Sequence, residues 1–315
     1  MGQEQSVLDA SPARQPAVEI EHFLGILSGH HIFRKIYRAK MFSATGPWRQ
    51  PSNWSAELER SVLSEIRELQ SEKKPNLLIL GPVGAGKSSF INSIISIGKG
   101  RICSMAGTGE RRDVSWTLDL ERYTEGSLLR RYRLFDSMGI EPSDGHGFHT
   151  DDLTFLIKGH IKNGYRFNPA GPIDKTSPYY RHNPTFQDQM HCVTFVMSAK
   201  AIHAGIPSAY EQKIKQLQEK ITREHIPRIL ILTKVDELCN EVAKDITKMF
   251  WSVKVKDAIN TASEMFGIEQ ALIHPVKNYE VDFDIETQTN IPLLLALRQT
   301  MQYAADRIQK DGDDD

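Results

Sequence analysis

The chain has 315 residues, and its 39 lysines and arginines nearly balance 40 aspartates and glutamates, giving a formal net charge of -1. This balance gives no electrostatic reason to expect a nucleic-acid partner. The apolar stretches all fall far short of the roughly 20 residues that span a bilayer, which argues against a transmembrane segment. The three cysteines lie far apart, so we expect reduced thiols in a cytoplasmic protein.

Residues 1–50 are predicted to form a loosely structured leader, because prolines and glycines interrupt them repeatedly. The leader opens with a Met-Gly-x-x-x-Ser pattern that fits N-myristoylation at Gly2, although no second membrane anchor follows at once. We expect one domain over residues 51–310 and an acidic tail over residues 311–315.

The domain is expected to open with an amphipathic helix that runs from Asn53, a good N-cap, to the Lys74-Pro75 pair. Beyond it, short apolar runs alternate with segments of helical periodicity. This βαβ pattern predicts an α/β fold with a mostly parallel sheet and helices on both faces. The expected strands are residues 77–80, 132–135, 193–197, 229–232 and 271–276, and the expected helices are residues 88–97, 152–161, 207–221, 241–251, 255–266 and 291–308.

Two further segments have a recognisable pattern. Residues 114–122 alternate with period two, which indicates an antiparallel edge strand. Residues 164–184 are rich in proline and are expected to form a long loop.

A phosphate-binding loop is predicted where GPVGAGKS matches the Walker A pattern GxxxxGK[ST] between an apolar strand and a helix. Its backbone N–H groups would bind phosphate, Lys87 would reach the β- and γ-phosphates, and the Ser88 hydroxyl would ligate Mg²⁺. The alternative is a glycine-rich turn with an incidental lysine. The nucleotide-binding residues expected here are Gly81, Gly84, Ala85, Gly86, Lys87, Ser88 and Ser89.

A second nucleotide motif, DxxG, closes the next apolar run at Asp136 and Gly139. The aspartate is expected to hold Mg²⁺ and the glycine N–H to meet the γ-phosphate. Ile140 follows, and its aliphatic side chain cannot orient a water as a glutamine does, so we expect slow hydrolysis at most. His146 and His149 fit a switch-two loop better than a metal cluster.

The base is predicted to bind at TKVD, residues 233–236, which follows an apolar strand and so lies at the carboxyl end of the sheet. The Asp236 carboxylate can accept from the N1–H and the exocyclic amine of guanine, a donor pair that adenine lacks. The stem of Lys234 can lie over the ring. Guanine is therefore favoured, with Thr233 in the same motif and Asn278 placed to close over the base.

The threonine that would ligate Mg²⁺ and sense the γ-phosphate is the least defined part of the site. Thr108, in a Gly-Thr-Gly turn, is the first candidate, with Ser115 and Thr117 behind it. An ordinary loop threonine explains Thr108 equally well. The expected metal ligands are Ser88, Asp136 and Thr108.

From Trp48 to Ile308 the chain resembles the interferon-induced protein 44 family. The segments that carry the resemblance include LLILGPVGAGKSSFINSI, LFDSMG, DDLTFLIKGHIKNGYRFNPAGPI, HCVTFV, ILTKVD and VKNY. The resemblance implies a P-loop domain that binds GTP or GDP, with a cytoplasmic role in interferon-driven antiviral immunity. It assigns nucleotide binding to Gly81, Gly86, Lys87, Ser88, Asp136, Gly139, Lys234 and Asp236. Longer family members carry a sizeable domain ahead of this one, where the present sequence is dissimilar.

Two functions remain open at this point. In the first, GTP and Mg²⁺ order the loops after Lys87 and Gly139, and an unidentified protein partner binds the ordered surface. In the second, the chain holds nucleotide structurally and acts as an interaction protein without a hydrolytic cycle. An ATP-binding protein is a third and weaker possibility, because Asp236 favours guanine.

Overall fold

The computed structural model describes residues 46–69, 73–107, 118–124, 127–142 and 146–312. Residues 1–45 form one contact unit and residues 46–315 another, and the description below concerns the second. The described part starts inside the predicted leader, at residues that are bound to the domain. The Trp48 N–H donates to the Phe250 carbonyl (3.0 Å), and Arg49 donates to the Ile273 carbonyl (2.8 Å). Gly2, the predicted acylation site, lies outside the described residues.

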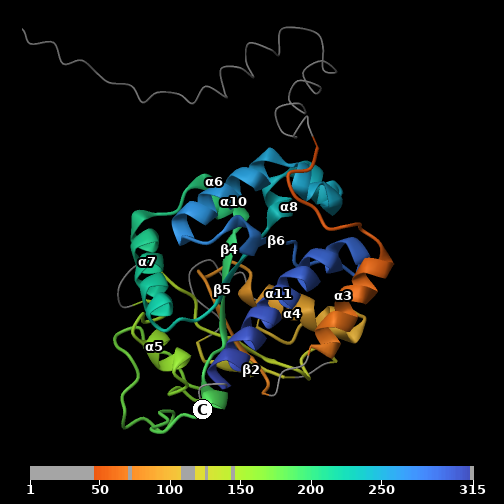
Figure 1. Cartoon of the computed structure of the whole chain (residues 1–315). Coiled ribbons are helices and arrows are strands. Elements are labelled where there is room, and N and C mark those ends of the chain that lie inside the picture. The colour runs from red at the N-terminus through yellow and green to blue at the C-terminus, as the bar shows by residue number, and fades with distance from the viewer. Residues whose placement is uncertain (1–45, 70–72, 108–117, 125–126, 143–145, 313–315) are drawn as a thin grey trace, which may run out of the picture. The chain divides into compact units, whose positions relative to one another are not determined.

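A six-stranded sheet of order β2-β3-β1-β4-β5-β6 forms the centre of the domain (Figure 1). All neighbouring strands pair in parallel except β2, which runs antiparallel to β3. The predicted mostly parallel sheet is therefore confirmed. Of the antiparallel strand expected over residues 114–122, residues 121 and 122 belong to β2, residues 118–120 lie outside any strand, and residues 114–117 lie outside the described residues. The strands are β1 Asn76–Leu80, β2 Glu121–Tyr123, β3 Arg133–Asp136, β4 Cys192–Ser198, β5 Arg228–Thr233 and β6 Ile273–Pro275.

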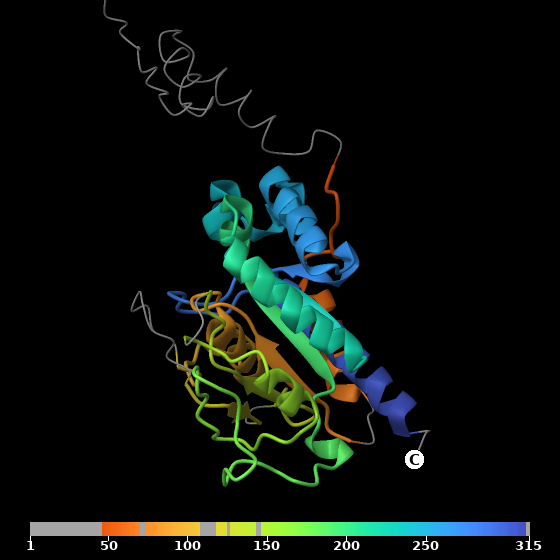
Figure 2. The ribbon, with the colours of Figure 1, turned by 90° about the vertical axis from the view of Figure 1, so that its left-hand side faces the viewer.

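Helices cover both faces of the sheet, as predicted (Figures 1 and 2). Leu77 and Ile79 of β1 join a buried core with α3, α4 and α11, whereas Phe195 of β4 packs against Phe266 of α10 on the opposite face. The helices are α3 Ala56–Glu68, α4 Lys87–Lys99, α5 Asp152–Ile157, α6 Ala199–Ala204, α7 Ser208–Arg223, α8 Val235–Leu238, α9 Asn240–Lys244, α10 Val253–Phe266 and α11 Thr287–Gly312, with 3-10 turns η1 Phe186–Asp188, η2 Ile246–Trp251 and η3 Gln270–Leu272.

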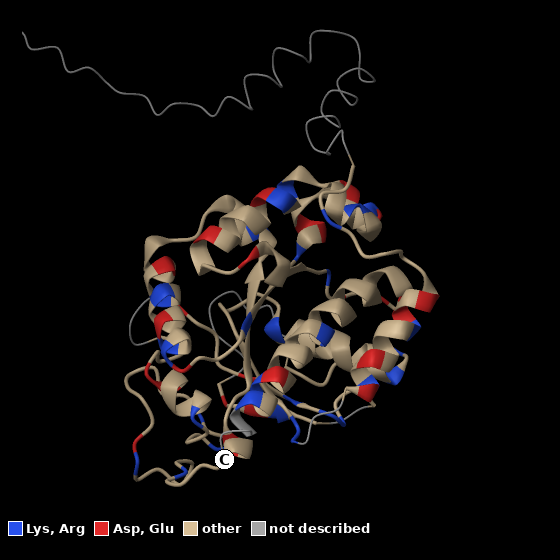
Figure 3. Cartoon of the chain, viewed as in Figure 1, with Lys and Arg blue, Asp and Glu red and all other residues tan. Residues whose placement is uncertain are grey.

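Along these helices, lysines and arginines lie among aspartates and glutamates (Figure 3). No helix in the described ranges combines the length and the apolar character needed to cross a bilayer.

The single helix expected over residues 241–251 is wrong, because α9 and η2 stand in its place. Asp245 between them has an extended backbone (φ -155°), and its carboxylate accepts the Thr247 N–H (3.1 Å). A side chain that captures a nearby backbone N–H competes with helix continuation. The helix expected over residues 152–161 is shorter than predicted, since Gly159 adopts φ +78° and a Cβ there would lie 2.6 Å from the Asp188 backbone.

The first helix begins later than expected, because Ser55 rather than Asn53 is its N-cap. The Ser55 hydroxyl accepts the Leu58 N–H (3.3 Å), while the Asn53 side chain accepts the Ser55 N–H (3.0 Å). A helix starts where a side chain satisfies one of its first free N–H groups, so the cap fixes the start.

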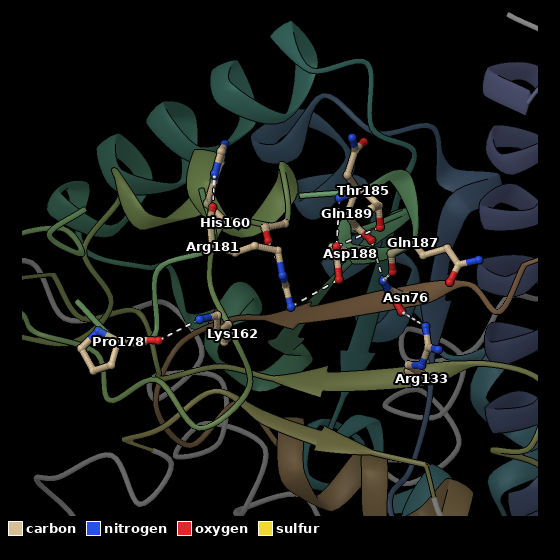
Figure 4. A network of polar contacts seen from close by, with 11 residues as sticks. Asn76, Arg133, His160, Lys162, Pro178, Arg181, Thr185, Gln187, Asp188 and Gln189 are labelled. Carbon is tan, nitrogen blue, oxygen red and sulfur yellow. Dashed lines mark hydrogen bonds and ion pairs between the residues drawn. The ribbon is translucent and has the colours of Figure 1, made fainter. Parts of the chain in front are cut away.

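The predicted long loop belongs to a segment between α5 and β4 that is tied to the amino-terminal end of the sheet (Figure 4). The Asn76 amide donates to the carbonyls of Gln187 and Gln189 (2.8 and 2.7 Å), and Arg133 donates to the Asn76 Oδ1 (3.0 Å). The Arg181 guanidinium pairs with a carboxylate of the same segment (3.3 Å). This network anchors the loop at the end of the sheet opposite the phosphate-binding loop.

Candidate nucleotide site

The Walker A segment lies between β1 and α4, at the carboxyl end of the parallel strands. Gly81 approaches β4 so closely that a Cβ would lie 2.1 Å from the Val196 carbonyl oxygen. Only glycine allows this approach. Gly84 and Gly86 adopt left-handed backbone conformations, with φ of +72° and +89°. These glycines let the chain turn sharply from the strand into the N-terminus of α4, where backbone N–H groups favour an anion.

Two side chains from distant parts of the chain hold the carbonyl groups of this loop. The Thr233 hydroxyl donates to the Ala85 carbonyl (2.6 Å), and the Asn278 amide donates to the Gly86 carbonyl (3.1 Å). In a trans peptide the carbonyl and the following N–H point in opposite directions. The bound carbonyls therefore turn the N–H groups of Gly86 and Lys87 the other way, which is the arrangement an anion requires.

Lys87, Ser88 and Asp136 meet at the start of α4. The Lys87 ammonium donates to the carbonyls of Gly81 and Pro82 (3.1 Å each), and the Ser88 hydroxyl donates to Asp136 Oδ2 (2.8 Å). Lys87 and Asp136 are both buried. Burial lowers the pKa of Lys87 and raises the pKa of Asp136, and the attraction between the two groups opposes both shifts.

The DxxG segment packs directly against the Walker A loop. A Cβ on Gly139 would lie 2.5 Å from Val83 Cγ2 and 3.0 Å from Val83 N, so glycine is required for this contact. The Ile140 N–H donates to the Gly81 carbonyl (3.0 Å), and the Phe148 N–H donates to the Gly139 carbonyl (3.0 Å). Ile140 is itself buried, and its aliphatic side chain offers no polar atom.

The TKVD segment forms the opposite end of the site. Lys234 adopts a left-handed backbone (φ +59°) that redirects the chain from β5 into α8, and its ammonium pairs with Glu237 (3.2 Å). Asp236 lies in the first turn of α8. Burial raises the pKa of Asp236, and the positive charge of Lys277 opposes that shift.

Most of the nucleotide-binding residues predicted from the sequence therefore lie at the carboxyl ends of the parallel strands, at or just after the ends of β1, β3, β5 and β6. Ser89 lies in the first turn of α4, half-buried, and its carbonyl accepts the Ser93 hydroxyl (2.8 Å). Thr108, like its alternatives Ser115 and Thr117, lies outside the described residues. His146 is exposed, and His149 accepts the Asp151 N–H through Nδ1 (3.3 Å).

Asn92 is a contributor that the motifs do not reveal. Its Oδ1 accepts the N–H groups of Met105 and Ala106 (2.8 and 2.7 Å), and its amide donates to the Ala106 carbonyl (3.0 Å). This buried amide thus fixes the chain just before the segment that contains Thr108. The available signal is an amide side chain in the stretch after Ser89, whose other polar residues up to Ile97 are the serines at 93 and 96.

The donor set suits a nucleoside phosphate with a divalent cation. Left-handed glycines, a helix N-terminus and a buried ammonium favour phosphate, whereas the Ser88 hydroxyl and the Asp136 carboxylate are hard oxygen ligands of the kind Mg²⁺ prefers. Ser88 Oγ and Asp136 Oδ2 lie 2.8 Å apart, close enough for both oxygens to ligate one cation. Asp236 offers a carboxylate acceptor at the far end.

Comparisons with known proteins identify relatives of the chain. No family model matches the chain. Interferon-induced protein 44-like of Homo sapiens is 32% identical over 257 residues, or 79% of this chain and 53% of that protein. Interferon-induced protein 44 of Mus musculus is 30% identical over 264 residues, or 81% of this chain and 61% of that protein. GPN-loop GTPase 3 of Debaryomyces hansenii is 27% identical over 192 residues, or 55% of this chain and 68% of that protein.

The chain spans little more than half the length of the two mammalian relatives. Over about four fifths of its own length, this chain is a homologue of the interferon-induced protein 44 and 44-like proteins.

Proposed function

We propose that the chain binds GTP and GDP with Mg²⁺ and acts as a slow guanine-nucleotide switch in the interferon-induced antiviral response, in the cytoplasm. The observation that carries the proposal is the single polar site that joins the Walker A loop to both Asp136 and the TKVD loop. The names of the mammalian relatives support the interferon-induced setting, and the name of the yeast relative supports GTP.

Each part of the site has a separate role in this proposal. The N–H groups of the Walker A loop and Lys87 bind the phosphates, and Ser88 and Asp136 hold Mg²⁺, which neutralises phosphate charge. The Gly139 N–H belongs to the loop that senses the γ-phosphate. Because Gly139 touches Val83, a displacement of either loop moves the other.

Asp236 is assigned to base recognition. Its carboxylate accepts from two donors that guanine has and adenine lacks, which favours GTP over ATP. Thr233 and Asn278 act as positioning residues, because they hold carbonyls of the Walker A loop while belonging to the loops around the base.

Calorimetry with GTP, GDP and ATP tests the proposal. Wild type should bind GTP and GDP well and ATP poorly. Lys87→Ala should weaken GTP binding by about 10- to 150-fold, since a buried charge-assisted contact is worth roughly 1.5 to 3 kcal/mol. Lys99→Ala, an exposed lysine on the same helix, is the matched control and should bind as wild type. Equal affinity of wild type for all three nucleotides, or no binding, would contradict the assignment.

A separate substitution tests whether Asp236 selects the base of the nucleotide. Asp236→Asn should shift preference from GTP toward xanthosine triphosphate, because an amide can donate to the 2-oxo group of xanthine. The exposed Asp257→Asn on α10 is a control for the loss of one charge. An unchanged ratio of the two affinities would remove Asp236 from base recognition and leave the phosphate assignment intact.

A further inference from the structure

The loop between β6 and α11 carries the two most exposed large apolar side chains of the described residues. Val281 is 90% exposed and Phe283 is 95% exposed, whereas other large apolar side chains in the described ranges reach at most 41%. Acidic residues alternate with them at Glu280, Asp282 and Asp284. We call residues 280–284 the acidic knob. Exposed aromatic side chains of this kind are typical anchors of protein interfaces.

The base of the acidic knob is held firmly. The Tyr279 hydroxyl donates to Asn290 Oδ1 (2.7 Å) and accepts the Glu286 N–H (2.7 Å), so one buried ring joins the two ends of the loop. The Lys277 ammonium pairs with Asp282 (2.7 Å). The knob is therefore a preorganised projection, and its apolar exposure is not the result of a loose chain end.

A cavity of about 390 Å³ lies beside the edge strand β6, between residues 49–52 and α11. Its lining includes the guanidinium groups of Arg49 and Arg298, and no carboxylate belongs to it. We call it the arginine pocket. Part of its wall is apolar, formed by Leu58, Phe250 and Leu295. The volume lies in the range of pockets that accept a small molecule or an anchoring side chain.

One of the two arginines of the arginine pocket, Arg49, has no carboxylate partner among the described residues. Arg49 donates to three backbone carbonyls and forms no ion pair with a described residue. Arg298 pairs with Glu65 (2.9 Å), while its buried Nε has no hydrogen-bond partner in the described part of the chain. His274 is neutral, because burial lowers its pKa to about 3. An apolar group with a neighbouring carboxylate fits this combination.

We propose that the acidic knob of one copy inserts into the arginine pocket of a second copy. Phe283 would lie against the apolar wall, and the carboxylate of Asp284 would face the Arg49 guanidinium. The chain itself supplies both complementary surfaces, which is why a second copy is the occupant. Figure 2 shows the knob loop projecting on the left and the segment after residue 46 on the right, so a chain cannot fill its own pocket.

Such a contact is heterologous, with each copy offering one knob and one pocket. It does not depend on the proposed nucleotide binding, so it is tested on the chain without nucleotide. Two substitutions at exposed positions separate the surfaces. Phe283→Ser removes the knob and leaves the pocket, and Ser52→Trp blocks the pocket and leaves the knob.

Sedimentation velocity from about 5 to about 500 μM, the range of weak specific contacts, is the test. The weight-average sedimentation coefficient of wild type should rise with concentration, and each variant alone should remain monomeric. An equimolar mixture of the two variants should form two-chain complexes, because one intact knob and one intact pocket remain. Tyr179→Ser, a change at another exposed aromatic side chain, should behave as wild type.

Two outcomes overturn the proposal. The first is a wild-type protein that stays monomeric over the whole range. The second is a mixture of Phe283→Ser and Ser52→Trp that fails to associate, which would show that any association of wild type uses other surfaces.

Discussion

Replacing Asp152 by asparagine is expected to make the protein more stable at neutral pH. Asp152 is fully buried at the start of α5. Its Oδ1 accepts the Ile173 N–H (2.8 Å), whereas Oδ2 has no hydrogen-bond partner among the described residues. Burial raises the pKa of Asp152 from 3.8 to about 7, the Ile173 N–H lowers it in part, and the charge of Asp151 raises it further. An asparagine keeps the acceptor oxygen and removes the buried charge.

The magnitude follows from the difference in pKa between the two states. Below pH 3.8 the carboxyl is protonated in both the folded and the unfolded chain, so it contributes nothing. Between pH 4 and 7 the unfolded chain loses the proton and the folded chain retains it, which lowers the free energy of unfolding by about 1.4 kcal/mol per pH unit. Over the interval of about three units the cost reaches about 4 kcal/mol, and above pH 7 it is constant.

Urea unfolding at pH 5, 6, 7 and 8 measures this effect. The stability of Asp152→Asn relative to wild type should rise by about 2 kcal/mol between pH 5 and 7, because the slope falls as the pH approaches the folded-state pKa of about 7, and then level off. Asp245→Asn is the control. Hydrogen bonds from Thr247 lower the pKa of the Asp245 carboxylate, so it does not titrate above pH 5. Parallel curves for Asp152→Asn and wild type would refute the reasoning.

Two other predictions concern the loop after β3. Gly139→Ala should lower the free energy of unfolding by roughly 1 to 3 kcal/mol, since its Cβ would overlap Val83, and it should weaken GTP binding. The control is Gly171→Ala, where a Cβ meets nothing within 4 Å. Equal urea midpoints for the two variants would contradict the contact between Gly139 and Val83. Intrinsic GTP hydrolysis should be slow, at or below the order of 10⁻³ s⁻¹, because Ile140 cannot orient a water. The variants His146→Ala and His149→Ala should leave this rate unchanged. A phosphate-release rate near the order of 1 s⁻¹ that rises with protein concentration would show assembly-stimulated catalysis instead.

The parts of the fold that the sequence predicts are those controlled by neighbouring residues. Apolar runs gave the strands because each central strand is buried on both faces, and the glycines at 84 and 86 indicated the turn because the left-handed region favours them. The single helix predicted over residues 241–251 was wrong for a reason that the spacing of apolar residues does not reveal. Asp245 there binds a backbone N–H two residues away, and this local bond outweighs the apolar spacing.

The parts that could not be predicted depend on contacts between residues far apart in the chain. Thr233 was expected to belong to the base motif, yet its hydroxyl holds the carbonyl of Ala85, 148 residues away. Asn278 was expected to close over the base, and its amide holds the carbonyl of Gly86, 192 residues away. No pattern along the chain encodes such contacts, because they arise only when β5 and β6 join the sheet that contains β1, with β4 between β1 and β5.

These distant contacts connect the loops that the proposed function assigns to phosphate and to base. The carbonyls of Gly81, Ala85 and Gly86 are each bound by groups from other loops, those after β3, β5 and β6. The Walker A loop is therefore shaped by the same loops that carry Gly139 and Asp236. A ligand that displaces the DxxG loop disturbs the Ile140 bond to Gly81, and a ligand that moves the base loop disturbs the bonds to Ala85 and Gly86. In the proposed site, a displacement of the DxxG loop or of the base loop is thus transmitted to the Walker A loop through hydrogen bonds to its carbonyl groups.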